Sequence, residues 1–233
     1  MTTKRPPSVP QIRLPGQAAA VEGPLDMTNI YLAHYGFRRD LGRLLTAVCQ
    51  VRLTDRGRVR ALAKHLKWVL LVLHHHHSSQ GTTVSPLLRQ RAPEATGMID
   101  SLEAEHREID RWIGETQSAF TVFERHPTEE RRARLTGALR SLADTLGAHL
   151  TRQETEGIPL MMTHITPEEA AKIERDIRRL YGLRSLTELV AWIGFDLPAD
   201  VEEHLRRHAP RDLLLLRKLA GRRYRRRMAY LWS

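Results

Sequence analysis

Four stretches of the chain carry apolar residues at steps of three and four, and each stretch holds a histidine in the same register. Residues spaced in this way share one face of an α-helix, so each histidine is predicted to face the core. The four histidines are His34, His76, His106 and His149. The pattern predicts an all-α fold, an antiparallel four-helix bundle to which each helix contributes one interior histidine.

The positions of the turns predict that the four histidines lie at one height in the bundle. In the first hairpin, His34 and His76 are equally distant in sequence from Asp55, which is in a turn-rich stretch. In the second, His106 and His149 are almost equally distant from Pro127, which ends one helix and suits the first turn of the next. A helix rises about 1.5 Å per residue, so partners differ by about 2 Å in height. The segment 81–95, which contains two prolines, is expected to be a loop returning the chain to the same end.

Four buried imidazoles at one level call for a common explanation. A single core histidine usually hydrogen-bonds a neighbouring group, but four together would each need a separate partner. A metal ion or a cofactor satisfies them jointly, so the sequence predicts such a site. Within the run His74–His77, only His76 and, less directly, His77 fall on the core-facing stripe.

Composition divides the chain into three parts. Residues 1–25 carry five prolines and no periodicity, and are predicted to form a disordered arm. Residues 26–160 hold the bundle, with helices expected over 28–52, 57–80, 95–125 and 128–157. Residues 161–233 are predicted to form further helices packed on the bundle, the first starting at Thr166, where a cap residue precedes proline and two acids.

The charge and the cysteine content limit which partners and which cellular compartment the sequence predicts. Most of the net charge of +10 lies in residues 210–233, where the Arg222–Arg227 cluster is predicted to be a solvated helix face, so nucleic acid is not an expected partner. No apolar run approaches the roughly 20 residues that cross a membrane. The single cysteine, Cys49, excludes an internal disulfide and is expected to pack within its helix. Together with the lack of a secretory leader, it predicts a cytoplasmic protein.

The segments around the histidines resemble the hemerythrin-like, or HHE cation-binding, family in its bacterial form. They read HYGFRRDLGRL, LHHHHSSQGTTVSPLL, LEAEHREID and HLTRQETEGIPL, and the tail LAGRRYRRRMAYLW is also similar. The resemblance covers residues 28–233. It implies a four-helix bundle holding a non-haem di-iron centre, with histidines as terminal ligands and two carboxylates bridging the irons. The implied chemistry is binding or reduction of dioxygen, peroxide or nitric oxide.

The chain departs from the family pattern at two positions. Gln80 and Gln153 stand four residues after His76 and His149, where the family usually has glutamate. A neutral amide neither bridges two irons nor balances their charge. Glu154 is the nearest surviving carboxylate, whereas Glu105 is expected to point away from the site.

Three hypotheses follow. The first is a di-iron protein acting on a small molecule such as dioxygen, peroxide or nitric oxide, in one form as an iron-dependent oxidase or oxygenase. Gln80 and Gln153 would then support its ligands by hydrogen bonding. The expected metal ligands are His34, His76, His77, His106, His149 and Glu154. The second is a bundle adapted to haem or to a single metal ion as a biosynthetic or redox enzyme. The third is a metal-free regulatory or scaffold module.

Overall fold

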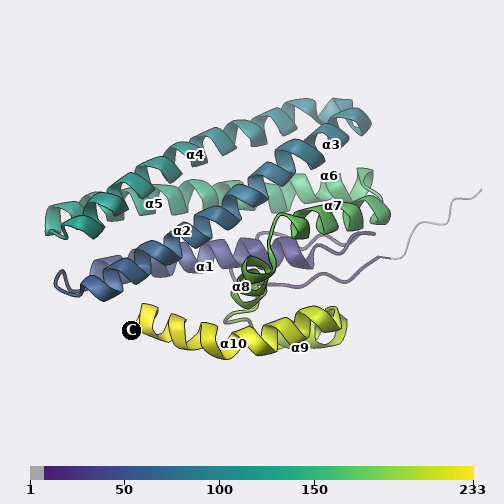
Figure 1. Ribbon diagram of the computed structural model, residues 1–233. Helices are drawn as coiled ribbons and strands as arrows, with labels where there is room; N and C mark the ends of the chain where they lie inside the picture. Colours follow the sequence, from purple (N-terminus) through teal and green to yellow (C-terminus); the bar gives the residue numbers. More distant parts are fainter. Residues whose placement is uncertain (1–7) are drawn as a thin grey trace, which may run out of the picture.

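Four long antiparallel helices form the body of the computed structural model, which describes residues 8–233 (Figure 1). Around the bundle, α1 contacts α2 and α5, and α4 contacts the same two helices. The all-α prediction is confirmed, since residues 8–233 contain helices and no strand. The helices are α1 Thr28–Gln50, α2 Arg56–Ser79, α4 Thr96–Arg125 and α5 Glu129–Arg152.

The apolar residues spaced three and four apart on the four long helices form the core, as predicted. Each helix turns its apolar residues inward, and burying one such side chain contributes about 1.5–3 kcal/mol. Two short turns close the hairpins: Asp55 caps α2 by accepting from the backbone N–H of Arg58, and Thr128 caps α5 in the same way. The fully buried members include Phe37, Leu44, Leu62, Leu66, Leu73, Ile109, Phe123, Leu139 and Leu146.

The helical backbone does not stop where α2 and α5 end, at Ser79 and Arg152. A π-helical turn, Gln80–Val84, joins α2 to α3, Ser85–Arg91. A second one, Gln153–Gly157, joins α5 to α6, Ile158–His164. In each π turn the glutamine carbonyl accepts a hydrogen bond from the N–H five residues ahead. Both helices therefore run on past the level of the histidines (Figure 1).

The expected loop over residues 81–95 is therefore wrong, because most of it is helical. Only a short 3₁₀ turn, Pro93–Ala95, separates α3 from α4. Pro86 suggested a break, since a proline ring clashes with the carbonyl four residues back in an α-helix. The π turn just before Pro86 relieves that clash and lets the helix continue.

The C-terminal part of the chain adds four helices, of which α8 and α10 contact each other and the bundle. In Figure 1, α9 and α10 lie along one side of the bundle, with α8 between them and α1. Thr166 and Glu169 form the capping box that starts the first of the four helices. Their bounds are α7 Pro167–Arg179, α8 Leu183–Ile193, α9 Ala199–His208 and α10 Arg211–Trp232.

Trp192 of α8 is the main anchor of this part. Its side chain is fully buried, lies with its ring 5.3 Å from that of Phe37, and covers Gly36. The indole N–H donates to Asp40 Oδ2 at 2.7 Å, and the same oxygen contacts His65 Nε2 at 2.7 Å. Burial would raise the pKa of Asp40, but hydrogen bonding to His65 and the nearby guanidinium of Arg39 lower it to about 2. Asp40 is thus a charged acceptor that ties α8 to α1 and α2.

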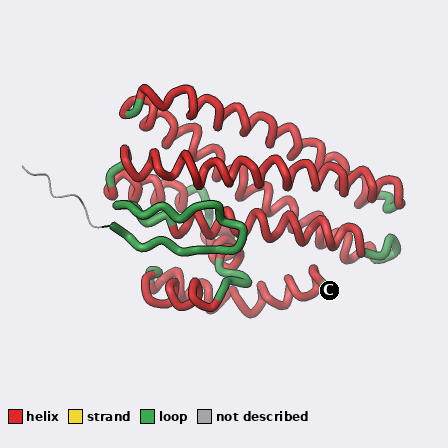
Figure 2. The backbone as a smooth tube through the Cα atoms, turned by 180° about the vertical axis from the view of Figure 1, so that it is seen from behind, coloured by secondary structure: helices red, strands yellow, loops and turns green. Residues whose placement is uncertain are grey.

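The N-terminal segment differs from the expected disordered arm. Residues 1–7 lie outside the described residues, but residues 8–27 pack on the bundle as an irregular strap that turns back on itself near Gly16, with Val9 bridging Gly23 (Figure 2). Ile12, Leu14 and Leu25 are buried in the strap, which explains why it packs. The Gln17 side chain satisfies backbone groups of the strap, a role that composition does not reveal.

Two smaller observations concern the surface. Cys49 is exposed, contrary to the expectation of packing, because it lies in the last turn of α1 on the side away from the core. Within residues 8–233, no helix combines the length and the apolar character that a membrane span requires.

Candidate metal centre

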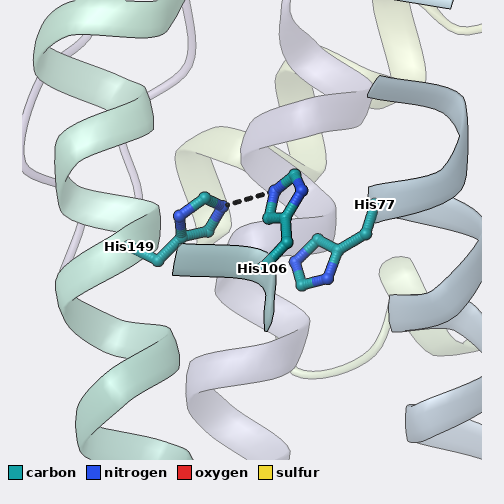
Figure 3. Close-up of side chains that lie close together, drawn as sticks. All are labelled: His77, His106 and His149. Atoms are coloured by element: carbon teal, nitrogen blue, oxygen red, sulfur yellow. Dashed lines mark hydrogen bonds between the residues drawn. The ribbon is translucent and has the colours of Figure 1, made fainter. Parts of the chain in front are cut away.

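Three histidines from three helices meet in the bundle interior. His77 of α2, His106 of α4 and His149 of α5 each offer a ring nitrogen, and these nitrogens lie within 4.8 Å of one another. The Nε2 atoms of His106 and His149 are 3.1 Å apart, and the His77 ring stacks on that of His106 at 4.1 Å (Figure 3). Donor atoms from separate helices thus converge on one small volume.

Two further histidines extend this cluster. The rings of His34, from α1, and His76, from α2, are 5.3 Å apart, and the His76 ring lies 5.8 Å from that of His77. Histidines from all four long helices therefore lie at one level, as the turn positions predicted. The rest of the run faces elsewhere: His74 is exposed, and His75 packs against Tyr181.

Several ring nitrogens in the cluster are buried without a hydrogen-bond partner. Among the described residues, no hydrogen-bonding group lies within bonding distance of His34 Nε2 or of either ring nitrogen of His77. Leaving a buried polar atom unpaired is unfavourable, and each such atom calls for an explanation, of which a bound ion is one. A bound metal ion would accept the lone pair of His34 Nε2 and that of one ring nitrogen of His77, so the residues present fit the cation that the cluster suggests.

Burial also sets the protonation of the cluster. Desolvation lowers the pKa of His34, of His76 and of His77, and neighbouring histidines lower the last two further. For His149, desolvation and the proximity of His106 lower the pKa to about 3. The rings are consequently neutral at neutral pH, the form in which imidazole binds a metal ion.

Glu154 lies on the Nδ1 side of the His34 ring. Its Oε1 contacts His34 Nδ1 at 2.8 Å and accepts from Arg38 at 2.7 Å, while Oε2 accepts from Ala18 N–H at 2.7 Å. Burial raises the pKa of Glu154, but the hydrogen bonds from His34 and Arg38 outweigh this and lower it. The structure thus gives Glu154 an orienting place rather than the expected ligand place. By accepting a hydrogen bond from Nδ1–H, it leaves the Nε2 lone pair of His34 free to bind a metal ion.

Glu105 plays the same part for His149, so the expectation that it points away is wrong. Its Oε2 contacts His149 Nδ1 at 2.7 Å, and its Oε1 accepts from Arg152 at 2.6 Å. Glu105 reaches across because α4 packs directly against α5. Glu103, by contrast, pairs with Arg89.

The sequence analysis did not assign Arg38 or Arg152 to the site. Arg38 follows His34 by four residues, and Arg152 follows His149 by three, so each lies on the helix face of its histidine. That spacing was the available signal, but the carboxylates that each arginine binds come from other turns and other helices.

Gln80 and Gln153 meet beside His76. The amide of Gln153 donates to Gln80 Oε1 at 2.7 Å, and the amide nitrogen of Gln80 lies 3.1 Å from His76 Nε2. Gln153 Oε1 lies 3.4 Å from the same ring nitrogen. The two amides thus occupy the inner face of the cluster, where the family pattern would place carboxylates.

A repeated pattern surrounds the two glutamines. Each hairpin reads His-x₃-Gln-x₅-Pro, from His76 to Pro86 and from His149 to Pro159, and each has its π turn between the glutamine and the proline. Single π turns within α-helices are frequent at functional sites. The repeat was present in the sequence, but its meaning depends on the backbone conformation.

A cavity of about 60 Å³ adjoins the cluster. Its polar lining residues are His34, Gln80, Ser85, Glu103, His106 and Gln153, and the remaining lining is mainly apolar. A larger hollow of about 650 Å³ lies on the outer side of α1, and none of the five clustered histidines lines it. The small cavity is therefore the space connected to the candidate site. Its apolar lining includes Ile30, Val84, Leu88, Met98, Leu102 and Met161.

The match to a family model agrees with this geometry. The model of the hemerythrin HHE cation-binding domain matches residues 26–161, which include the four long helices and all five clustered histidines. The chain belongs to the hemerythrin HHE family. The family and the histidine cluster together indicate a helical bundle that binds a metal cation. No curated protein and no solved structure matches the chain significantly.

Proposed function

We propose that this hemerythrin-like bundle holds iron on histidine side chains and uses it to bind a small oxygen- or nitrogen-containing molecule: dioxygen, peroxide or nitric oxide. The observation that carries the proposal is the set of buried ring nitrogens that lack a partner among residues 8–233. His77, His106 and His149 form the centre of the ligand set, and His34 and His76 complete it. Imidazole is a suitable ligand for iron.

The surrounding residues hold these rings in place. Glu154 and Glu105 fix the Nδ1 protons of His34 and His149, which makes the opposite nitrogens better donors. Arg38 and Arg152 in turn fix the two carboxylates. Bound iron would supply the redox chemistry, whereas the chain's own residues orient the histidine rings and exclude water from the site.

The ligand set supports one ion better than two. A pair of irons is normally bridged by carboxylates, but both oxygens of Glu154 are already bound by other groups. Gln80 and Gln153 provide only neutral amides at the two positions where the family usually has glutamate. We therefore propose a single iron ion, with the di-iron centre as the alternative that metal analysis would reveal.

The cavity supports a small ligand. About 60 Å³ accommodates a molecule of a few heavy atoms, whereas pockets for drug-sized ligands and cofactors are about 300 Å³ or more. The haem hypothesis is therefore not favoured. The mainly apolar lining is suited to uncharged diatomic molecules that pass through the cavity to the histidine cluster.

Metal analysis of the full-length protein tests the proposal. After anaerobic loading with ferrous iron, we expect one iron per chain and a change in the absorption spectrum on addition of nitric oxide. His106→Ala and His149→Ala should lose most of the iron. His74→Ala, which removes an exposed histidine, should retain it. Full iron content in both core variants, or a stoichiometric haem band, would show that the proposal is wrong.

A further inference from the structure

Helix α10 has two faces of opposite character. Its inner face packs against α8 and the bundle. The buried side chains of this face are Tyr224, Met228 and Leu231, which belong to the main hydrophobic core. In Figures 1 and 2, α10 lies at the edge of the molecule, so its outer face is turned away from the bundle. The fold therefore leaves the outer face open to a partner.

The outer face carries a stripe of exposed residues at steps of three and four, the spacing that places side chains on one side of a helix. The members of the stripe are Leu215, Leu219, Arg222, Arg226 and Tyr230. Leu215 is 58% exposed and Leu219 is 69% exposed. Single exposed apolar side chains are ordinary, but these two leucines lie one turn apart and adjoin a cluster of arginines. The stripe thus combines apolar and cationic side chains.

The outer face is also strongly cationic. Its exposed basic residues are Arg211, Lys218, Arg222, Arg223, Arg225 and Arg226. Arg217 and Arg227 pair with Glu202 and Glu188, whereas none of the six outward cations forms an ion pair within residues 8–233. Asp212, in the first turn, is the only acid in the helix. The positive charge of this face is therefore largely uncompensated.

The combination of charge and exposed leucine distinguishes between partners. A second copy of the chain would place like charges opposite each other, which is unfavourable. The phosphates of a nucleic acid would pair with the arginines but would give the leucines no apolar contact. An anionic bilayer offers phosphate headgroups to the arginines and, just beneath them, acyl chains to the leucines. Clusters of about four to eight basic residues on an amphipathic helix are typical of contact with anionic lipid.

We propose that the outer face of α10 docks on the surface of an anionic phospholipid bilayer. The helix lies along the surface, because the stripe extends from Leu215 to Tyr230. The arginines contact lipid phosphates, and Leu215 and Leu219 enter the boundary between headgroups and acyl chains. The inner face stays packed, so the folded bundle is carried to the membrane surface. This inference is independent of the metal site and goes beyond the proposed function.

Flotation of the full-length protein with lipid vesicles tests the proposal. We expect binding to vesicles that contain phosphatidylcholine and phosphatidylglycerol, and no binding to vesicles of phosphatidylcholine alone. Salt screens charges at a surface, so binding should weaken as the ionic strength rises. The metal-free protein should bind as well as the loaded protein, because no residue of the outer face belongs to the histidine cluster.

The first variant is Arg222→Gln with Arg223→Gln and Arg226→Gln. It should lower the affinity for anionic vesicles about tenfold or more, because each basic residue near such a surface adds to the attraction. Glutamine is as good a helix former as arginine, so α10 should persist. The matched control makes the same change of charge at exposed arginines of α4 and α5 and should bind nearly as well as the native protein. Its substitutions are Arg107→Gln, Arg134→Gln and Arg140→Gln.

The second variant, Leu215→Gln with Leu219→Gln, separates a bilayer from a nucleic acid. It leaves the charge unchanged and removes the apolar contact, so the affinity for anionic vesicles should fall. Leu71→Gln with Val122→Gln is the control, since both side chains are exposed on the bundle and their replacement should leave vesicle binding unchanged. Circular dichroism checks that all variants keep their helices.

Three results would overturn the proposal. The first is a native protein that does not bind anionic vesicles at low ionic strength. The second is equal vesicle affinity in the α10 arginine variant and its control. The third is vesicle affinity that the leucine substitutions do not change. Tight, salt-sensitive binding to duplex DNA that the arginine variant loses would, with the third result, assign the face to nucleic acid instead.

Discussion

Arg38 binds both carboxylate oxygens of Glu154, at 2.7 Å and 3.2 Å. Glu154 is fully buried, and Arg38 is 18% exposed at the rim of the bundle. The guanidinium is therefore the main counter-charge of a carboxylate that would otherwise be available to a cation. Arg38 thus holds Glu154 in the position from which it orients His34.

Arg38→Met should destabilise the metal-free protein by about 3 kcal/mol, because it leaves the buried carboxylate of Glu154 without its cationic partner. Urea unfolding measures the loss. Arg43→Met is the control, since Arg43 pairs with Asp196 in an exposed setting and its removal should change stability by less than about 1 kcal/mol. Similar losses in the two variants would contradict the role assigned to Arg38.

Gln80→Glu with Gln153→Glu should have opposite effects on the metal-free and loaded proteins. The two side chains are in direct contact, so two carboxylates there would repel each other and lower the free energy of unfolding of the metal-free protein. In the loaded protein they could bridge, and iron per chain should rise from one toward two. Calorimetric unfolding and elemental analysis check the two effects. An unchanged iron content of one would argue against restoring a di-iron centre by these residues alone.

Gly36→Ala should loosen the C-terminal helices. A Cβ atom at Gly36 would lie 2.6 Å from the Cζ2 atom of Trp192, which is too close for a rigid, buried indole. We expect a loss of about 1–3 kcal/mol in stability and faster proteolysis within residues 166–233. Gly42→Ala, also in α1, meets no atom within 4 Å and should be neutral or slightly stabilising. Equal protease resistance in both variants would contradict the docking role of Trp192.

The metal-free protein should lose stability as pH falls from about 6.5 toward 3. The pKa of His149 is lowered from 6.5 to about 3, so over this range the unfolded chain binds a proton that the native state does not. Each histidine of this kind contributes about 1.4 kcal/mol per pH unit. Asp40, with its pKa lowered to about 2, adds a further loss below its ordinary value of 3.8. His149→Gln should give a shallower slope between pH 6 and pH 4 in urea unfolding, and an unchanged slope would contradict this assignment.

The helices and their common histidine level could be predicted from periodicity because both depend on local spacing. Steps of three and four fix a helix face, and two hairpin turns fix the heights. In the structure His34 lies against His76 and His106 against His149. His77, which the sequence analysis placed less directly on the core face than His76, connects the two pairs.

The polar surroundings of the histidines could not be predicted in this way. Glu105 and Glu154 were assigned from their positions on their own helices, yet their contacts are made to other helices and to the N-terminal strap. A carboxylate side chain reaches several ångströms sideways, so its position along one helix does not fix its partner. The prediction of a loop around Pro86 failed for another reason. The residue types of the preceding π turn did not indicate that the helix continues.

Each π turn adds one residue to a helix that would otherwise keep its register, so the residues beyond it are rotated by about 100°. Leu88 in α3 and Met162 in α6 lie beyond the two turns and are buried. Deleting a single residue from each turn, such as Gly81 and Thr155, would direct these side chains to solvent without altering either one. The closure of this end of the bundle therefore depends on the register that the two π turns set.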